Sequence, residues 1–124
     1  MEFAEKAREN LEAVERLLPD DDGVRDCLAN AVASRAYYAA YLALAHVAQE
    51  KRLPFTSTKG DYYQHDTFPD DAARYRLIDD EGRRDLAYLR GMRVKADYSE
   101  DPVEHDEASE SAEVASAFVK GLIG

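Results

Sequence analysis

The stretch ANAVASRAYYAAYLALAHVA, residues 29–48, decides the fold. It contains nine alanines, three tyrosines and no acidic residue. A helix that is apolar nearly all round is a buried one, and small alanine side chains let neighbouring helices come close. We therefore expect a central helix that runs from about Asp22 or Gly23 to Lys51 and ends before Pro54.

Four further segments show the spacing of amphipathic helices. The first ends at the Pro-Asp-Asp-Asp-Gly break of residues 19–23, and a short helix is expected over 70–78. A fourth helix follows Gly82, and the fifth is expected to have Asp101 as its cap and Pro102 at its first position. The expected core-facing residues are Phe3, Ala7, Leu11, Val14 and Leu18 in the first helix, Leu86, Leu89, Met92 or Arg93 and Ala96 in the fourth, and Ser111, Val114, Ala115, Phe118 and Leu122 in the fifth.

These patterns predict an all-α fold, an antiparallel up-and-down bundle of four to five helices. A chain of 124 residues fits a single domain over residues 1–124. No strand-like alternation longer than four residues and no internal repeat interrupts the helical pattern. The longest connection is expected from Leu53 to Pro69, and a long loop of this kind is where a ligand-covering segment is expected.

The composition excludes several classes of protein. A net charge of −10 argues against a general nucleic-acid binder that neutralises many phosphates. The single cysteine, Cys27, excludes an intrachain disulfide and is expected to be a small buried hydrophobe. The N-terminus lacks the features of a secretory signal, and the longest charge-free run, residues 36–49, is too short for a bilayer. We therefore expect a cytoplasmic protein with no membrane contact.

The charge is unevenly distributed along the chain. Residues 74–96 contain seven basic and four acidic side chains, whereas residues 97–124 contain eight acidic ones and a single base, Lys120. One interpretation is complementary helix faces within the bundle. The other is a local phosphate site on an otherwise repulsive surface, with an acidic last helix that could dock a basic partner.

No motif for a metal or for a bound cofactor is present. The chain lacks the glycine-rich phosphate loops, the H-E-x-x-H pattern and the C-x-x-C pattern. Its three histidines, His46, His65 and His105, lie far apart, and no Glu-x-x-His pair of a di-iron bundle occurs. The sequence therefore predicts neither a metal site nor a cofactor.

One polar group interrupts the central helix within SRAYYAAY, residues 34–41. Arg35, Tyr38 and His46 are spaced to form one stripe of that helix. A buried arginine without a partner would lose several kcal/mol of solvation. The stripe is therefore either a polar seam that lines a pocket, or a structural network in which Arg35 is held by an aspartate of another helix, for which Asp97 is well placed.

A second group of polar residues lies in LRGMRVKADY, residues 89–98. Arg93 and Asp97 are four residues apart, so they can pair along one helix face. Arg90 and Lys95 are candidates to point at a phosphate, which arginine in particular binds with a planar fork of donors.

Together the two segments resemble the HEPN domain superfamily, in particular its branch of small stand-alone prokaryotic proteins. The resemblance covers nearly the whole chain and implies a helical bundle that commonly forms homodimers. It also implies frequent pairing with a minimal nucleotidyltransferase in toxin–antitoxin-like modules. Active members are metal-independent ribonucleases, in which an arginine and a histidine with four to six residues between them meet across the dimer and promote attack by the RNA 2′-hydroxyl.

The chain departs from that ribonuclease pattern. No arginine is followed by a histidine at the required spacing. Arg93 matches the position of the motif's arginine, and Tyr98 stands where the histidine would be. Tyrosine titrates near pH 10 and is a poor proton shuttle at neutral pH, although its hydroxyl can bind a phosphate or a ribose. The resemblance therefore implies that Arg93 and Tyr98 occupy the positions of the motif, but it does not imply that they are catalytic.

The first hypothesis is therefore a HEPN protein that is non-catalytic or depends on a partner. It would bind a nucleotidyltransferase, a nucleotide or RNA, with Arg90, Arg93, Lys95 and Tyr98 as the candidate binding residues.

Two alternatives remain open. One is a diverged metal-independent ribonuclease that uses Arg93 with Tyr98, or with His46 or His65 brought in by folding. The other is an oligomeric helical scaffold without a ligand, in which the arginines and Asp97 form an internal salt-bridge network.

Overall fold

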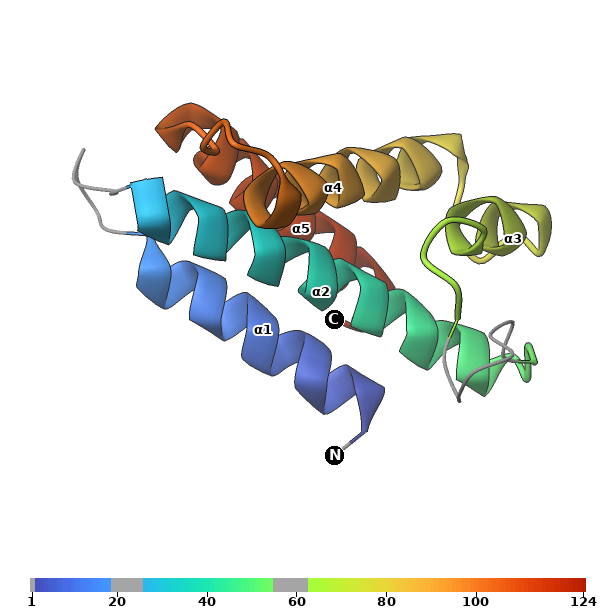
Figure 1. The fold of residues 1–124 in the computed structure, drawn as a ribbon. Coiled ribbons are helices and arrows are strands. Elements are labelled where there is room, and N and C mark those ends of the chain that lie inside the picture. The colour runs from blue at the N-terminus through green and yellow to red at the C-terminus, as the bar shows by residue number, and fades with distance from the viewer. Residues whose placement is uncertain (1, 19–25, 55–62) are drawn as a thin grey trace.

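A computed structural model of the chain is an all-α bundle (Figure 1). It describes residues 2–18, 26–54 and 63–124, and within these ranges no strand occurs. The helices are α1 (Phe3–Leu17), α2 (Asp26–Glu50), α3 (Phe68–Arg74), α4 (Asp80–Tyr98) and α5 (His105–Ile123). The predicted fold class, an all-α bundle of four to five helices, is confirmed.

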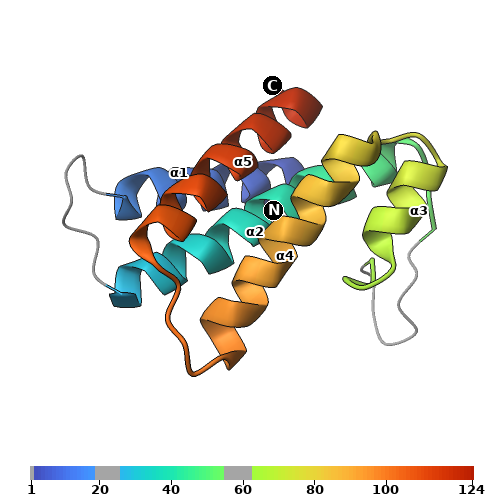
Figure 2. The same ribbon diagram turned by 90° about the horizontal axis from the view of Figure 1, so that it is seen from above.

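The second helix is the centre of the bundle, as its composition predicts. α2 contacts α1, α4 and α5, and α1 runs antiparallel beside it in both views (Figures 1 and 2). Eight of the nine alanines between Ala29 and Ala48 are buried. These small side chains let three helices approach one backbone closely. The expected start of this helix, at Asp22 or Gly23, lies outside the described residues.

Tyrosine and phenylalanine side chains pack and hydrogen-bond between the segment before α3 and the central helix. The rings of Tyr63 and Phe68 stack with centroids 4.4 Å apart. The Tyr41 hydroxyl donates to the Tyr63 carbonyl at 2.6 Å, and the Tyr63 hydroxyl donates to the Leu53 carbonyl at 2.8 Å. Because both hydroxyls are tied to backbone groups, the short segment that carries His65 is held against α2.

The outer helices bury much of the stripes that their spacing predicts. α3 begins at Phe68, two residues earlier than expected, with Pro69 in its first turn. Val114 and Leu122 are only partly buried, although both pack against the core. The buried residues are Ala4, Ala7, Leu11 and Val14 in α1, Leu86 and Leu89 in α4, and Ala108, Ser111, Ala112, Ala115, Phe118 and Val119 in α5.

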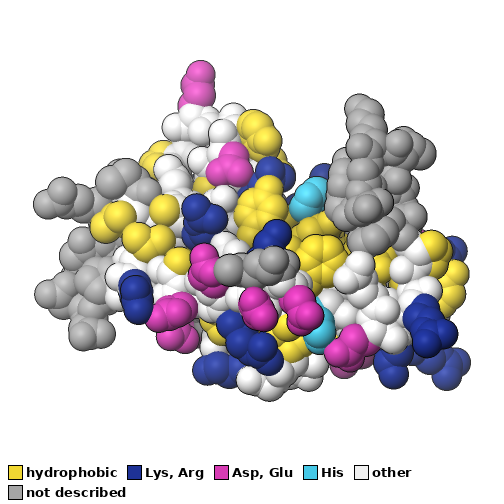
Figure 3. All heavy atoms as spheres, turned by 90° about the horizontal axis from the view of Figure 1, so that it is seen from below, with side chains coloured by type: hydrophobic (Ala, Val, Ile, Leu, Met, Phe, Trp, Pro, Cys, Tyr) yellow, Lys and Arg dark blue, Asp and Glu magenta, His cyan; other side chains and the backbone are white. Residues whose placement is uncertain are grey.

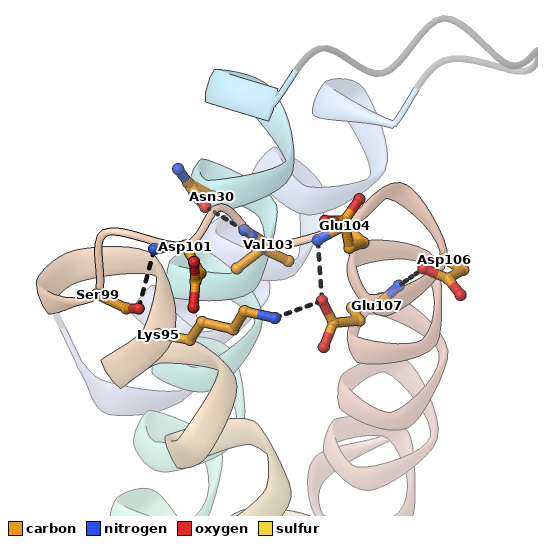
Figure 4. A network of polar contacts seen from close by, with 8 residues as sticks. All are labelled: Asn30, Lys95, Ser99, Asp101, Val103, Glu104, Asp106 and Glu107. Carbon is orange, nitrogen blue, oxygen red and sulfur yellow. Dashed lines mark hydrogen bonds and ion pairs between the residues drawn. The ribbon is translucent and has the colours of Figure 1, made fainter.

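The connection from α4 to α5 is held by polar contacts (Figure 4). The expected cap of α5, Asp101, is wrong: the helix is capped by Glu104, whose backbone N–H donates to Glu107 Oε1 at 2.9 Å in a capping box. The backbone N–H of Val103 donates to Asn30 Oδ1 at 2.9 Å. This bond fixes the linker to α2 before α5 begins, which places the helix start after Asp101 and Pro102.

Within the described ranges, no helix is long and apolar enough to cross a membrane. In the same part of the chain, no group of three or more histidine, cysteine or acidic side chains is arranged to hold a metal ion. The Cys27 side chain and residues 55–62 of the expected long loop lie outside the described residues.

Candidate functional site

Arg93 lies at the centre of a group of polar side chains from α2 and α4. Its Nη2 donates to the Tyr38 hydroxyl at 3.1 Å, and its Nε lies 3.0 Å from Asp97 Oδ2. The Nε–H does not point at an acceptor within the described residues, so the contact with Asp97 is an ion pair rather than a hydrogen bond. This is the pair that the four-residue spacing predicts.

Two tyrosine rings contact the same guanidinium group. The Arg93 Cζ atom lies 5.4 Å from the centroid of the Tyr38 ring and 5.5 Å from that of Tyr98. Both distances are within the range of a cation–π contact. Tyr98 is 73% exposed, whereas the Arg93 side chain is 17% exposed. The arginine is thus held in place by a partly buried tyrosine and a partly exposed carboxylate, and its guanidinium group also contacts one tyrosine that solvent reaches.

His65 joins this group from the segment before α3. Its Nδ1 atom forms a short hydrogen bond with the Tyr37 hydroxyl. Its ring centroid lies 4.4 Å from that of Tyr41 and 6.1 Å from that of Tyr38. Three tyrosines of one α2 face therefore fix the position of a histidine that is far from them in sequence.

The surroundings keep His65 neutral. Burial lowers the pKa of His65, and the positive charges of Arg93 and Arg90 lower it further, against a smaller opposing effect of Asp66. Burial also raises the pKa of Tyr37 far above its ordinary value. The Tyr37 phenol therefore stays protonated and can donate to Nδ1, which leaves the ring proton of His65 on Nε2.

Arg90 lies three residues before Arg93, and one of its buried N–H donors lacks a hydrogen-bond acceptor within the described residues. Its Nε atom is buried and finds no acceptor in the part of the chain that the structure describes. Arg90 and His65 line a pocket of about 460 Å³. A second arginine, Arg83, also lines the pocket, and its Nη1 lies 3.5 Å from Asp70 Oδ1. A buried N–H without an acceptor is costly, and the same arginine lies on the wall of this pocket, which the carboxylates of Asp66 and Asp70 also line.

We call these side chains together the Arg93 cluster. It consists of Tyr37, Tyr38, His65, Arg90, Arg93, Asp97 and Tyr98. On the face of the molecule shown in Figure 3, a histidine lies among hydrophobic side chains with Lys or Arg side chains close by.

The sequence-based assignment of Arg35 is wrong. Arg35 is exposed, and its Nη1 donates to Asn10 Oδ1 on α1 at 3.4 Å. It is neither buried nor paired with Asp97, because Asp97 meets Arg93 one turn away in its own helix. Of the expected network of Arg35, Tyr38 and Asp97, the last two are brought together, and they are joined by Arg93 instead.

Lys95 does not belong to the cluster either. Its Nζ lies 2.9 Å from Glu107 Oε1 on α5, as Figure 4 shows. A residue two positions after Arg93 is rotated by roughly 200° around the helix axis, so it faces another neighbour. The structure thus corrects the grouping of Lys95 with Arg90 as a pair aimed at one phosphate.

Of the two histidines considered as partners of Arg93, folding brings in one. His46 Nε2 lies 2.8 Å from Glu50 Oε1 within the last turns of α2. His65 instead reaches the Arg93 cluster. The sequence alone assigns no role to the Tyr37 hydroxyl. The only signal that points to it is its place in the SRAYYAAY motif, residues 34–41. His65 lies outside any helical repeat, so no periodic pattern could have selected it.

The comparison with known families fits this geometry. A family model described as the HEPN domain matches residues 1–122. The chain belongs to the HEPN domain family. No curated protein and no solved structure gives a significant match. The two segments that resemble HEPN sequences lie in α2 and in the C-terminal half of α4, and the Arg93 cluster forms where these segments of the HEPN domain meet.

Proposed function

We propose that this HEPN domain binds the phosphate of a nucleotide or of RNA at the Arg93 cluster, as a non-catalytic protein that acts with a partner. One observation carries the proposal: the buried Nε of Arg90 has no acceptor within the described residues, and Arg90 lines a pocket together with His65 and Arg83. Guanidinium groups bind phosphate oxygens with two parallel hydrogen bonds. Arg90 and Arg93, three residues apart on one helix, would therefore hold one phosphate between them.

The position of Tyr98 supports the proposal that the bound phosphate is part of a nucleotide. Its ring is exposed and lies next to the Arg93 guanidinium. Stacking of a base on such a ring contributes about 1–3 kcal/mol and requires no particular base. The overall charge of −10 opposes contact with a long RNA, so the ligand is a single nucleotide or the end of an RNA strand.

A ribonuclease is the second candidate, and the position of His65 is the observation that favours it. This candidate requires the other His65 tautomer, in which the ring proton lies on Nδ1 and is donated to the Tyr37 hydroxyl. Nε2 of the neutral imidazole, beside two arginines, could then accept the proton of an RNA 2′-hydroxyl. The 2′-oxygen would then attack the phosphorus, the bond from phosphorus to the 5′-oxygen would break, and the 5′-oxygen would take up a proton from water. The products would be a 2′,3′-cyclic phosphate and a 5′-hydroxyl, with the arginines holding the charged phosphate throughout.

We further propose that the domain forms a homodimer through an exposed stripe of α4. Ala87, Gly91, Val94 and Tyr98 follow one another at helical spacing, and all four are exposed. A Cβ added at Gly91 would meet nothing within 4 Å, so a second helix could approach there. Ala87, Gly91 and Val94 also line the pocket beside Arg90, so a dimer would cover that pocket with a second copy of α4 and bring two copies of the cluster together. The second partner that we propose is a minimal nucleotidyltransferase, because the family resemblance implies pairing with such a protein.

The test combines binding and cleavage in excess EDTA. Fluorescence anisotropy with a 5′-labelled single-stranded RNA and with a labelled adenine nucleotide measures affinity. Gel analysis of the same RNA measures cleavage. The variants Arg93→Ala, Arg90→Ala and His65→Gln are compared with the unchanged chain, and Arg16→Ala on α1 serves as the control for loss of one exposed positive charge.

Binding that is lost in Arg93→Ala and Arg90→Ala, without cleavage, is the expected result. Cleavage that ends in a 2′,3′-cyclic phosphate and disappears in His65→Gln would establish the second candidate in its place. A folded chain that neither binds nor cleaves would overturn both and leave the scaffold without a ligand.

A further inference from the structure

A second hollow lies between the turn that joins α3 to α4 and the C-terminal half of α5. It encloses about 780 Å³ and shares no lining residue with the pocket beside Arg90. Its apolar lining includes Leu77, Ile78, Phe118 and Leu122, all of which belong to or pack against the core. A Cβ added at Gly121, on the same wall, would meet nothing within 4 Å, so the groove is open above that glycine.

The local sequence builds this apolar floor. Two residues after the end of α3, Arg76 has a left-handed conformation, φ 60°, and the Leu77 N–H donates back to the Ala72 carbonyl at 2.9 Å. Such a closure turns the chain sharply and directs the residue after it onto the helix. A Cβ added at Gly82 would lie only 3.0 Å from Ile78 Cβ. Glycine at that position therefore lets the turn lie against the first turn of α4.

The rim of the groove is acidic. Asp79, Asp80, Glu81 and Asp85 line it, and Arg76 is the basic residue among its lining. Asp80 Oδ1 lies 3.9 Å from Arg83 Nε. Glu81 and Asp85, in contrast, have no ion pair within the ranges that the structure describes. Burial and the nearby carboxylate of Glu81 raise the pKa of Asp85. These carboxylates therefore repel one another and would be stabilised by a cation from outside.

We propose that this groove docks an amphipathic helix of another protein, with Leu, Ile or Phe on its apolar face and Lys or Arg beside that face. The apolar floor fits the first requirement and the acidic rim the second. The described part of the chain offers no strand edge to which an extended peptide could add. The inference goes beyond the phosphate site and stands whether or not Arg93 binds a phosphate.

Three synthetic peptides test the proposal on the full chain. The first is a 14-residue helix of leucine and lysine with the leucines on one face, the second has the same composition in scrambled order, and the third has glutamate in place of lysine. Two-dimensional NMR of the labelled protein locates binding, and calorimetry measures the dissociation constant. We expect the first peptide to shift the amides around Leu77, Ile78, Phe118 and Leu122, and to bind at least about tenfold more tightly than the others.

Two variants examine the floor and the rim separately. Gly121→Arg places a bulky cation over the open groove, and we expect affinity to fall about tenfold or more. Glu81→Gln removes one carboxylate of the rim, and we expect about threefold weaker binding with a smaller dependence on salt. Glu113→Gln removes an exposed carboxylate of α5 that does not line this groove, and it should leave the affinity unchanged. Circular dichroism verifies that each variant is folded.

Several results would overturn the proposal. The scrambled peptide could bind as well as the amphipathic one, Gly121→Arg could bind as tightly as the unchanged chain, or the shifts could centre on residues 104–113. Sedimentation that shows a second copy of this chain seated in the groove would also overturn it. Arg93→Ala should bind the peptide normally. A chain that binds RNA but no peptide therefore contradicts this inference alone, and one that binds peptide but no RNA contradicts the proposed function alone.

Discussion

Asp97 sits one helical turn after Arg93, with its Oδ2 3.0 Å from the Arg93 Nε, so the arginine proposed to hold a phosphate already has a carboxylate partner. A phosphate at this site would compete with that carboxylate for the same guanidinium group. Asp97 thus orients Arg93 and at the same time limits the affinity of any anion that binds there.

Replacing Asp97 by asparagine should separate these two effects. The pair is partly exposed, so we expect Asp97→Asn to lower the free energy of unfolding by only about 1 kcal/mol. The affinity for a phosphate ligand should rise, because the competing charge is removed. Urea denaturation and RNA anisotropy measure the two quantities. Lower stability with no gain in binding would favour the scaffold without a ligand.

The stability of the domain should depend on the charge of His65. Its pKa is lowered in the folded state, so the unfolded chain takes up a proton first as the pH falls below about 6.5. The His65 contribution is therefore lost between that pH and the lower pKa of the folded state. Urea midpoints at pH 7.5 and pH 5.5 check this, since the drop should be smaller in His65→Gln. An equal drop in both proteins would contradict the assignment.

Tyr37→Phe should alter His65 without removing it. The variant loses the hydrogen bond to Nδ1 and should be less stable by about 1 kcal/mol. Because a donor to Nδ1 favours the neutral ring, its loss should move the pKa of His65 upward. A titration of the histidine side chains by NMR measures this shift. Tyr75→Phe, at an exposed tyrosine of the α3 end, is the control and should leave the His65 pKa unchanged.

Glu107 should stabilise the α4–α5 connection only while it is ionised. The hydrogen bond from Lys95, followed by that from the Glu104 backbone, lowers the pKa of Glu107. Its contribution is then present above the ordinary glutamate pKa of about 4.3 and is lost as the pH falls through the folded value. Glu107→Gln should thus destabilise the domain more at pH 7 than at pH 3. A penalty that is the same at both pH values would show that the ion pair contributes nothing.

The salt dependence of RNA binding should be shallow. For single strands, the slope of log affinity against log salt is about −0.7 for each neutralised phosphate. If Arg90 and Arg93 share one or two phosphates, the slope should lie between about −0.7 and −1.4. Anisotropy titrations at several salt concentrations measure it. A much steeper slope would show that other basic residues carry the binding.

The elements with a continuous apolar pattern could be predicted from the sequence. The alanines of α2 specify a buried helix whatever surrounds them, and the α1 stripe of Ala7, Leu11 and Val14 is buried as its spacing predicts. The Arg93–Asp97 pair could also be predicted from the sequence, because both residues lie on one helix and their spacing alone brings them together.

The rest of the site depends on contacts between elements. Whether Arg35 is buried is decided by how α1 covers α2, and whether Lys95 faces the site is decided by where Glu107 lies. His65 comes from a non-helical segment that the Tyr63 and Phe68 rings hold in place. No spacing rule within one segment contains this information.

The concentration of tyrosines around Arg93 has a practical consequence for spectroscopy. The chain has eight tyrosines and no tryptophan, and Tyr37, Tyr38, Tyr41 and Tyr98 all lie within ring-contact distance of His65 or Arg93. Half of the tyrosines therefore surround a single site. Tyrosine emission and near-ultraviolet dichroism, which usually average over a whole protein, should here act as an unlabelled reporter of what happens at that site.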